Sequence, residues 1–489
     1  MLWALLAVPT LAGLAAFFIR PDGPRRALLV ATAFAHAALS AVCWVRPPAP
    51  VLFGYLELDA AGKLFLGLTS ALFLAAAFYA VGFLRGEVRS KEREEEEGFL
   101  FDNAPEAVFT GCLLSFLATM TLAALAQHFG LLWVAVEATT LASAPLIHFH
   151  RHHRSLEATW KYLLICSVGI ALALLGNFFL AVAARGHEDI LMTARELVGH
   201  AGTLDGPWLK AAFLLFLVGY GTKMGLAPLH TWLPDAHSEA PSVVSALLSG
   251  ALLNCAFLAL MRVHAVCAAA GLADFSGGLL VGFGLLSMAT AAAFILGQAD
   301  YKRMLAYSSV EHMGILAFGA GLGVAAPAAM LHAVSHSLTK SMLFLTAGNI
   351  LSAARSKSTL EVRGLLRALP VSGALWLAGF LAITGSPPFG PFLSELWILK
   401  GALAAGRPGL AALYLALLAA VFVAMAGIVL RMAHGEPSER LKDAPPERDL
   451  WRLAPPLALA LLVLVLGLWT PPFLLAAVRD AALVLGGRP

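Results

Sequence analysis

Residues 158–183 show what kind of protein this is, because residues 162–183 read YLLICSVGIALALLGNFFLAVA, without a charged side chain. A helix of that length spans the hydrocarbon core of a bilayer. The rest of the chain has the same character: 60% of its 489 residues are hydrophobic, 13% are charged, and the mean hydropathy is +0.81. A water-soluble chain of this length could not bury so much apolar surface. We therefore expect an all-α polytopic membrane protein.

Apolar runs separated by charged or Pro/Gly clusters predict about fourteen transmembrane helices. The twelfth run is too long for one straight helix, and Pro387 and Pro388 predict a break in it. A second break is expected in the seventh run, at Pro228. Two broken helices at comparable places are typical of inverted-repeat transporters. The expected spans are 2–19, 27–45, 64–84, 107–126, 130–148, 158–183, 209–230, 243–267, 277–297, 304–324, 326–352, 370–404, 409–432 and 453–478.

Lys and Arg are unevenly divided between the two sets of connecting loops. The loops after odd-numbered spans, with their flanks, carry 21 of these residues, against 9 at the termini and in the even-numbered loops. The positive-inside rule therefore predicts that the odd loops are cytoplasmic and that both termini lie on the outer face. We expect an N-terminal three-helix segment with an acidic loop at 1–106, a first repeat at 107–268, a second at 269–432, and a last loop and span at 433–489.

Several kinds of partner or site are disfavoured by composition. The basic residues are scattered, which argues against nucleic-acid binding. The five cysteines form no C-x-x-C pair, so iron–sulfur and thiolate-zinc sites are not expected in this chain. The histidine run 148–153 is interpreted as a cap of span five, and the acidic run 92–97 as a solvated loop. The apolar N-terminus is interpreted as a first span, not a cleaved signal.

Ionisable residues inside the predicted spans are the candidate functional residues, because a charge in hydrocarbon costs about 2.5–3.5 kcal/mol or more. One such residue could serve helix packing. A larger set favours function, because buried salt bridges are rarely net stabilisers. The primary candidates are Glu137 in span five, Lys223 and His230 near the break of span seven, His332, His336 and Lys340 on one face of span eleven, and Glu395 after the break of span twelve. The secondary candidates are Glu311, His312, Lys400 and Asn254.

These residue types suit the storage and relay of protons. A lysine in a low dielectric is driven toward its neutral form, an approaching carboxylate restores its charge, and histidine titrates near neutral pH. The spacing also relates the two predicted repeats. The 172-residue separation of Lys223 and Glu395, applied to Glu137, falls two residues before Glu311. We therefore hypothesise that Glu311, with His312, is the second-half counterpart of Glu137.

Three sequence blocks resemble the antiporter-like, proton-translocating membrane subunits shared by respiratory complex I, Mrp-type cation/proton antiporters and energy-converting NiFe hydrogenases. The blocks are KMGLAPLHTWLPDAH at 223–237, DYKRMLAYSS at 300–309 and the His332/His336/Lys340 face. The segments SLEATWKYLLICSVG at 155–169 and GSPPFG at 385–390 are most similar to component F of hydrogenase-4-type complexes. The resemblance covers about residues 105–432.

The resemblance implies fourteen helices, two inverted five-helix repeats and both termini on the outer face. It also implies roles for matching residues: Glu137 modulates Lys223, Lys223 is the central proton carrier, Lys340 with His332 and His336 links to the second half, and Glu395 is the terminal proton-carrying group. One position departs from the complex I pattern, where span eight usually carries a lysine or histidine and this chain has Asn254. A relay past Asn254 would need water or His230.

The sequence thus predicts a proton-translocating subunit of a redox-driven complex in a prokaryotic cytoplasmic membrane. Its expected partners are other membrane subunits and a peripheral module that carries the iron–sulfur clusters and the NiFe or quinone site. The chain itself is expected to hold no cofactor, metal or catalytic centre. Two alternatives stay open: an Mrp-like sodium/proton antiporter subunit without a redox partner, and a non-conducting membrane anchor. A transferase for lipid-linked substrates is less favoured, because Glu137 and Glu395 lie well inside spans.

Overall fold

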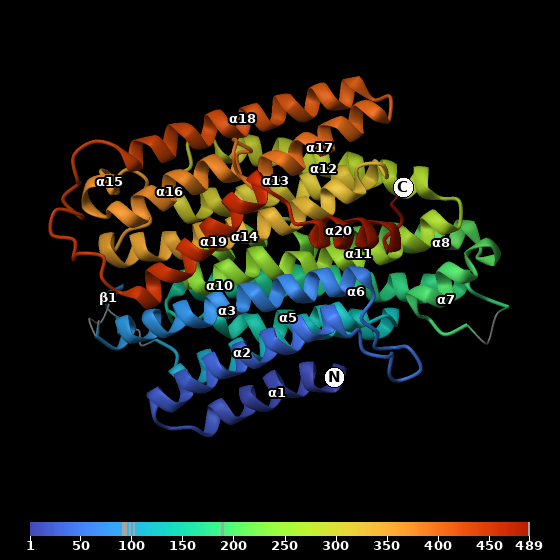
Figure 1. Cartoon of the computed structure of the whole chain (residues 1–489), viewed down its shortest axis with the longest axis horizontal. Coiled ribbons are helices and arrows are strands. Elements are labelled where there is room, and N and C mark those ends of the chain that lie inside the picture. Colours follow the sequence, from blue (N-terminus) through green and yellow to red (C-terminus); the bar gives the residue numbers. More distant parts are fainter. Residues whose placement is uncertain (90–94, 97–98, 101–102, 187–189, 488–489) are drawn as a thin grey trace.

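The computed structural model describes residues 1–89, 95–96, 99–100, 103–186 and 190–487, so most of the predicted acidic loop lies outside the described residues. The described chain is a bundle of helices whose axes run along one direction (Figure 1). A two-residue hairpin pairs Glu95 with Leu100 in antiparallel register. The elements are α1 (Leu2–Phe18), α2 (Asp22–Val45), α3 (Ala60–Arg89), β1 (Glu95–Glu96), β2 (Phe99–Leu100), α4 (Glu106–Leu125), α5 (Phe129–Ile147), α6 (His153–Ala183), α7 (Ala194–Gly199), η1 (Ala201–Thr203), α8 (Gly206–Met224), α9 (Trp232–Glu239), α10 (Ser242–Leu247), η2 (Leu248–Leu252), α11 (Leu253–Ala269), α12 (Ala273–Ile295), α13 (Tyr301–Gly321), α14 (Ala326–Ala354), α15 (Leu365–Ala368), α16 (Pro370–Ile383), α17 (Gly390–Ala404), α18 (Pro408–Ala433), α19 (Leu450–Leu468) and α20 (Pro472–Val484).

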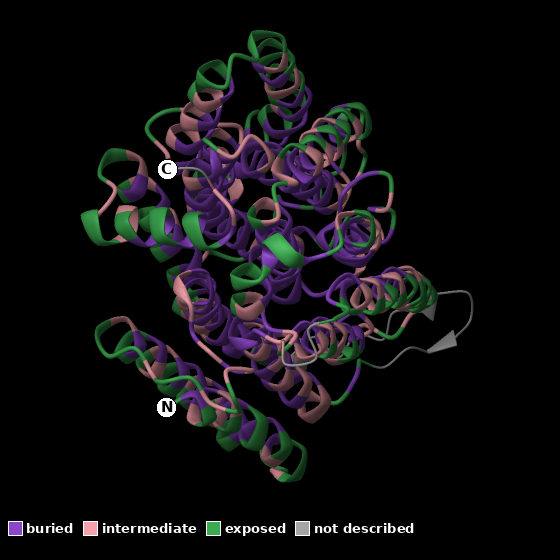
Figure 2. Ribbon diagram, turned by 90° about the vertical axis from the view of Figure 1, so that its right-hand side faces the viewer, coloured by how far each residue is buried: buried purple, intermediate pink, exposed green. Residues whose placement is uncertain are grey.

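Burial divides the helices into an inner and an outer set. The segment α10–η2–α11, α13 and most of α14 are buried on all sides, whereas α1, α2, α6, α18 and α19 present one exposed face outward (Figure 2). The exposed faces are apolar, with side chains such as Leu164, Val168 and Val423. An apolar outward face is what lipid contact requires, and an apolar helix surrounded by protein forms the core.

The predicted all-α membrane architecture is confirmed. Each expected span coincides with a helix or with a pair of helices. Within the described ranges, nine helices are long and apolar enough to cross a membrane. The count of fourteen spans, the two inverted repeats and the domain boundaries stay predictions. Both termini lie toward the end of the bundle opposite β1 and α15 (Figure 1), and their orientation in a membrane is likewise a prediction.

The two expected helix breaks are present. Helix α8 ends at Met224, and Gly225 follows in the left-handed conformation with φ +83°. A Cβ on Gly225 would lie 2.5 Å from Leu233 Cδ1, so glycine is needed there for conformation and for space. The second break separates Ile383, the last residue of α16, from Gly390, the first of α17.

Two features of the helices were not predicted. The prediction of a single helix over 453–478 is wrong, because α19 ends at Leu468 and α20 begins at Pro472. Pro471 and Pro472 lack the backbone N–H needed to continue α19 but suit the start of α20. Span eight contains the π-helical turn η2, where a Cβ on Gly250 would lie 2.5 Å from Ser341 Oγ of α14. The close approach of α14 explains the glycine.

The histidine run after α5 caps helices. His148 is the C-cap residue of α5, and its Nδ1 lies 3.0 Å from Ser155 Oγ. His152 is the N-cap residue of α6, where its Nδ1 accepts a hydrogen bond from the backbone N–H of Ser155 at 3.2 Å. Burial, with the nearby charge of Arg151, lowers the pKa of His148 in this loop. The prediction of a helix cap is therefore confirmed.

Candidate functional site

Lys223 is the centre of a first cluster of polar side chains. It lies in the last turn of α8, one residue before the break, and is fully buried. Its Nζ donates hydrogen bonds to Thr140 Oγ1 of α5 at 2.8 Å and to Tyr162 Oη of α6 at 2.6 Å. The ammonium also lies 4.4 Å from the centroid of the Tyr162 ring. Three helices thus hold a single buried amine with hydroxyl groups and an aromatic face.

Glu137 joins this cluster through a hydroxyl bridge. Thr140 Oγ1 accepts from Lys223 and donates to Glu137 Oε2 at 3.2 Å. Ser167 Oγ donates to the other carboxylate oxygen at 2.9 Å. Glu137 is half-buried, whereas Lys223 is fully enclosed. The amine and the carboxylate are therefore coupled through one threonine hydroxyl, an arrangement in which one group senses the charge of the other.

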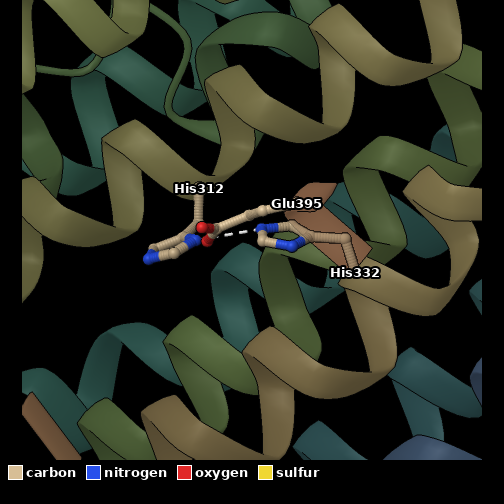
Figure 3. Close-up of side chains that lie close together, drawn as sticks. All are labelled: His312, His332 and Glu395. Carbon is tan, nitrogen blue, oxygen red and sulfur yellow. Dashed lines mark hydrogen bonds between the residues drawn. The ribbon is translucent and has the colours of Figure 1, made fainter. Parts of the chain in front are cut away.

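A second cluster joins His312 of α13, His332 of α14 and Glu395 of α17 (Figure 3). His312 Nδ1 lies 3.0 Å from His332 Nε2, and His332 Nδ1 lies 2.9 Å from Ser394 Oγ. One ring or carboxylate atom of each of the three residues lies within 4.8 Å of the others. Histidine and carboxylate also bind zinc. Here the facing ring nitrogens share a hydrogen bond, which suits the cluster to holding a proton.

The second helix break shapes the surroundings of Glu395. Gly385 has φ +66°, and a Cβ there would lie 1.9 Å from Glu395 Oε2. The carboxylate therefore rests directly on the backbone of the break. Its Oε1 is buried and has no hydrogen-bond partner among the described atoms. Glu395 is 6% exposed, so it needs either a proton or a nearby cation to avoid the cost of an isolated buried charge.

Side chains of α14 connect the second cluster to Lys340. The rings of His332 and His336 stack with centroids 6.4 Å apart, as their four-residue spacing predicts, and the His336 ring also lies 5.1 Å from that of His312. Lys340 is fully buried, and its Nζ donates to the carbonyl of Leu305 at 2.7 Å. Glu311 interacts with Lys340 electrostatically, and its Oε2 lies 4.0 Å from His312 Nε2.

Asn254 lies between the two clusters, on α11 directly after the π-helical turn. Its Nδ2 donates to the carbonyl of Gly250 at 2.9 Å and to Ser337 Oγ of α14 at 2.7 Å. Within the ranges that the structure describes, no unbroken chain of side-chain hydrogen bonds joins Lys223 to Lys340. The space between Lys223 and Lys340 thus holds the Asn254 amide and the Ser337 hydroxyl, neither of which titrates near neutral pH.

Two sequence candidates lie apart from these clusters. His230 is in the loop between α8 and α9, and its ring contacts the rings of Phe294 and Tyr307 at centroid distances of 6.4 and 6.1 Å. Lys400 is exposed on α17 and lies outside both buried clusters. At about 100° per residue, five residues turn a side chain well away from the face of Glu395. That periodicity could have placed Lys400 correctly.

The uncharged residues that build both clusters were not predicted from the sequence. Thr140 follows Glu137 by three residues, on the same helix face, and Tyr162 and Ser394 are ordinary polar residues without a distinctive pattern. His237 was not among the candidate residues either. It is fully buried and stacks on Phe344, with ring centroids 4.9 Å apart. Only the helix spacing of Thr140 offered a usable signal.

Residues 126–422 match the model of the family described as NADH:quinone oxidoreductase/Mrp antiporter, TM. The chain belongs to this family. The hydrogenase-4 component F homolog of Methylacidiphilum infernorum is 40% identical over 358 residues, which cover 72% of this chain and 74% of the relative. NADH-quinone oxidoreductase subunit N of Desulforudis audaxviator is 29% identical over 408 residues, which cover 81% of this chain and 76% of the relative. Hydrogenase-4 component B of Escherichia coli is 28% identical, and the chain spans 56% of its length.

Solved structures give the same fold over nearly the whole chain. A chain of respiratory complex I from Thermus thermophilus has a TM-score of 0.78 and 26% identity, with 98% of this chain and 100% of that chain covered. A chain of an archaeal membrane-bound sulfane sulfur reductase reaches a TM-score of 0.85 at 20% identity, covering 99% and 98%. The resemblance predicted from the sequence is confirmed, and the chain is a multi-pass, antiporter-like membrane subunit.

Proposed function

We propose that this chain translocates protons as a membrane subunit of a redox-driven complex of the hydrogenase-4 or complex I type. The observation that carries the proposal is Lys223, a fully buried amine whose Nζ is bound to two hydroxyls and is separated from Glu137 by one of them. The similarity to hydrogenase-4 components and to NADH-quinone oxidoreductase subunit N supports it. The redox chemistry and its cofactors then belong to partner subunits.

In the first step, the charge of Lys223 follows the charge of Glu137. A buried ammonium is costly unless an opposite charge is near, so a change at Glu137 changes how readily Lys223 holds its proton. Glu137 is half-buried and therefore open to influence from a partner subunit or from solvent. Thr140 transmits the change, because its hydroxyl contacts both groups. Lys223 then releases its proton toward α11.

In the second step, the proton crosses from Lys223 to Lys340 past Asn254. An asparagine amide does not carry a proton at neutral pH, so this crossing depends on water molecules bound to amide and hydroxyl groups. Asn254 and Ser337 are placed for that purpose, because they bond to each other between α11 and α14. We propose this interval as the slowest part of the path.

In the third step, imidazoles carry the proton from Lys340 to Glu395. An imidazole accepts a proton on one nitrogen and releases one from the other, so hydrogen-bonded rings form a relay. His336, His312 and His332 provide these rings. The centroid of the His312 ring lies 5.1 Å from that of His332 and 5.1 Å from that of His336. Water must bridge to His336, because its ring nitrogens have no hydrogen-bond partner among the described atoms. Glu395 lies beside the His312–His332 pair and serves as the terminal group. Glu311, beside Lys340, takes the part that Glu137 has at Lys223.

The test uses membrane vesicles that contain the complete complex, with redox-driven proton uptake as the readout. Replacing Lys223 by alanine should reduce proton uptake by about a hundredfold or more, the range for loss of a proton-transferring side chain. Lys210→Ala, on the exposed face of the same helix, is the matched control and should pump like the parent. Full pumping by Lys223→Ala would refute the proposed path.

The same vesicles distinguish the two alternatives. A sodium/proton antiporter without a redox partner would exchange sodium for protons on an imposed gradient, with no electron donor present. A non-conducting anchor would leave redox turnover intact while proton uptake is equal in the parent and in Lys223→Ala. The anchor is an alternative because Asn254, which does not titrate near neutral pH, separates Lys223 from Lys340. Redox-dependent uptake that needs Lys223 excludes both alternatives.

A further inference from the structure

A surface cavity of about 430 Å³ lies at one end of the bundle, between the start of α2, the end of α3 and the start of α19. Its polar lining consists of Arg26, Arg85 and Trp451, and its apolar wall includes Ala27, Val30 and Val81. None of these residues belongs to the proposed proton path. The cavity therefore needs an explanation of its own.

The mouth of the cavity carries a positive charge that has no carboxylate partner within the described part of the chain. Arg85 is exposed, and its guanidinium lies 5.3 Å from the centroid of the Trp451 ring. Among the described residues it has no carboxylate partner. Arg26 differs, because its Nε and Nη2 bind both oxygens of Glu106 at 2.9 and 2.6 Å, which leaves Nη1 for another acceptor. Counted over the described residues Arg26, Arg85 and Glu106, the mouth has one net positive charge.

Trp451 is held firmly in place beside Arg85. Its ring stacks on Phe78 of α3 with centroids 5.4 Å apart. Gly82 of α3 permits this approach of α19, because a Cβ there would lie 3.0 Å from Trp451 Cβ and 2.5 Å from Arg452 Cγ. The guanidinium and the indole thus form a fixed wall of the cavity.

The depth of the cavity matches the headgroup boundary of a bilayer. Arg26 and Arg85 lie within the first two turns from their helix ends, and Val30 and Val81 lie one turn deeper, about 6 Å along each helix. Arginine and tryptophan are favoured at membrane interfaces. This end also carries β1, α15 and the loop before α19 (Figure 1), the end that the distribution of Lys and Arg assigns to the cytoplasm. Cations at the mouth with an apolar wall beneath fit a molecule that has a charged head and a hydrocarbon chain.

A second groove provides a contrast within the same molecule. It has a similar volume, about 440 Å³, and lies between α16 and α19, where Pro370, Val371, Leu375 and Leu457 line it. All of its lining residues are apolar. An acyl chain of any lipid suits such a groove, and nothing in it selects a headgroup. Selectivity for a lipid headgroup is expected only in the cavity that Arg26 and Arg85 line.

We propose that the cavity between α2, α3 and α19 binds an anionic phospholipid. Its phosphate contacts Arg85 and Nη1 of Arg26, its glycerol region lies against Trp451, and an acyl chain follows Val30 and Val81. A free phosphate ion would use the arginines but leave the apolar wall uncovered. The bound lipid fills the space between the N-terminal helices and α19. A basic pocket between helix ends on the cytoplasmic side is a recognised kind of anionic-lipid site.

The test measures quenching of Trp451 fluorescence by brominated phospholipids in detergent-solubilised full-length protein. Brominated phosphatidylglycerol and brominated phosphatidylcholine are titrated separately, and the Trp451 signal is obtained by subtracting the Trp451→Phe variant, because the chain has ten tryptophans. Phosphatidylglycerol should quench at lower concentration. Arg85→Gln should reduce this preference about fivefold, the effect of one basic residue at a membrane surface. Arg85→Lys should retain most of it.

Arg407→Gln is the matched control, since Arg407 is exposed at the start of α18, at the opposite end of the bundle, and the substitution changes the net charge equally. It should leave the preference unchanged. Size-exclusion profiles show whether each variant keeps the fold. Equal quenching by the two lipids in the parent, or an unchanged preference in a folded Arg85→Gln, would overturn the proposal. Inorganic phosphate that competes with phosphatidylglycerol at equal concentration would also overturn it, because the apolar wall would then contribute nothing to binding.

Discussion

The two polar clusters use opposite ends of broken helices. Lys223 lies in the last turn of α8, before its break, where the helix dipole favours a positive charge. Glu395 lies in the second turn of α17, after its break, where its carboxylate rests on the backbone of Gly385. Their surroundings also differ, because hydroxyls bind Lys223 whereas imidazoles surround Glu395. The comparison shows that a helix break inside a bundle can hold either a basic or an acidic buried side chain.

The largest loss of proton uptake is expected when the acid is removed from the second cluster. Glu395→Gln keeps the size of the side chain but cannot exchange a proton. If Glu395 is as necessary as Lys223, steady-state redox-driven proton uptake over many turnovers should fall about a hundredfold in vesicles. Glu439→Gln, at an exposed position in the loop after α18, should pump normally. Equal pumping by the parent and Glu395→Gln would remove the second cluster from the path.

A slightly smaller effect is expected at the helix break itself. Gly385→Ala places a methyl group 1.9 Å from Glu395 Oε2 and forces a left-handed conformation on alanine. The carboxylate must then move away from the His312–His332 pair, and proton uptake should fall at least about tenfold. Gly406→Ala is the matched control, because it has φ +69° but open space around its Cβ. It should cost about 1 kcal/mol of stability in thermal unfolding and leave pumping intact.

The hydroxyl bridge of the first cluster should have a moderate effect. Thr140→Val preserves shape but removes hydrogen bonds to two charged groups, each worth about 1.5–3 kcal/mol. Proton uptake should fall about tenfold. Thr140→Ser restores the hydroxyl and should recover most of the activity, with the same vesicle assay as readout. Identical rates for the valine and serine variants would show that the bridge does not couple Glu137 to Lys223.

The smallest expected effect concerns the interval between the clusters. Asn254→His introduces a titratable group between Lys223 and Lys340 and should raise the rate of proton uptake by less than about tenfold, below the usual range for a proton-transferring residue. Asn254→Gln is the control, because it keeps an amide. A lower rate in Asn254→His than in Asn254→Gln would mean that this interval does not limit the flow.

The sequence predicts the fold well where proline and glycine mark a helix break inside a run too long for one span. Pro228 and the segment 384–391 marked the breaks of spans seven and twelve. The break between α19 and α20 was missed although Pro471 and Pro472 carry the same signal as Pro387 and Pro388, because the run 453–478 has nearly the length of one straight span. The π-helical turn at Leu248–Leu252 could not be predicted, since it depends on how α14 packs against Gly250.

The candidate site was predictable in its ionisable members and not in their partners. Charged residues such as Lys223 and Glu395 stand out in an apolar helix because each is costly there. Thr140, Tyr162 and Ser394 do not stand out, because hydroxyl residues are common in membrane helices and bond to many partners. Only the three-dimensional arrangement shows which hydroxyl bridges which charge.

The order of the two clusters can be tested by recording proton uptake and proton release on opposite sides of vesicles that contain Glu395→Gln, after a single addition of electron donor. If protons pass from Lys223 through Lys340 to Glu395, the variant should take up an initial proton at the parent's rate and fail to release it. Lys223→Ala should lose the initial uptake as well. Release by Glu395→Gln at the parent's rate would contradict a path in which the two clusters act in series.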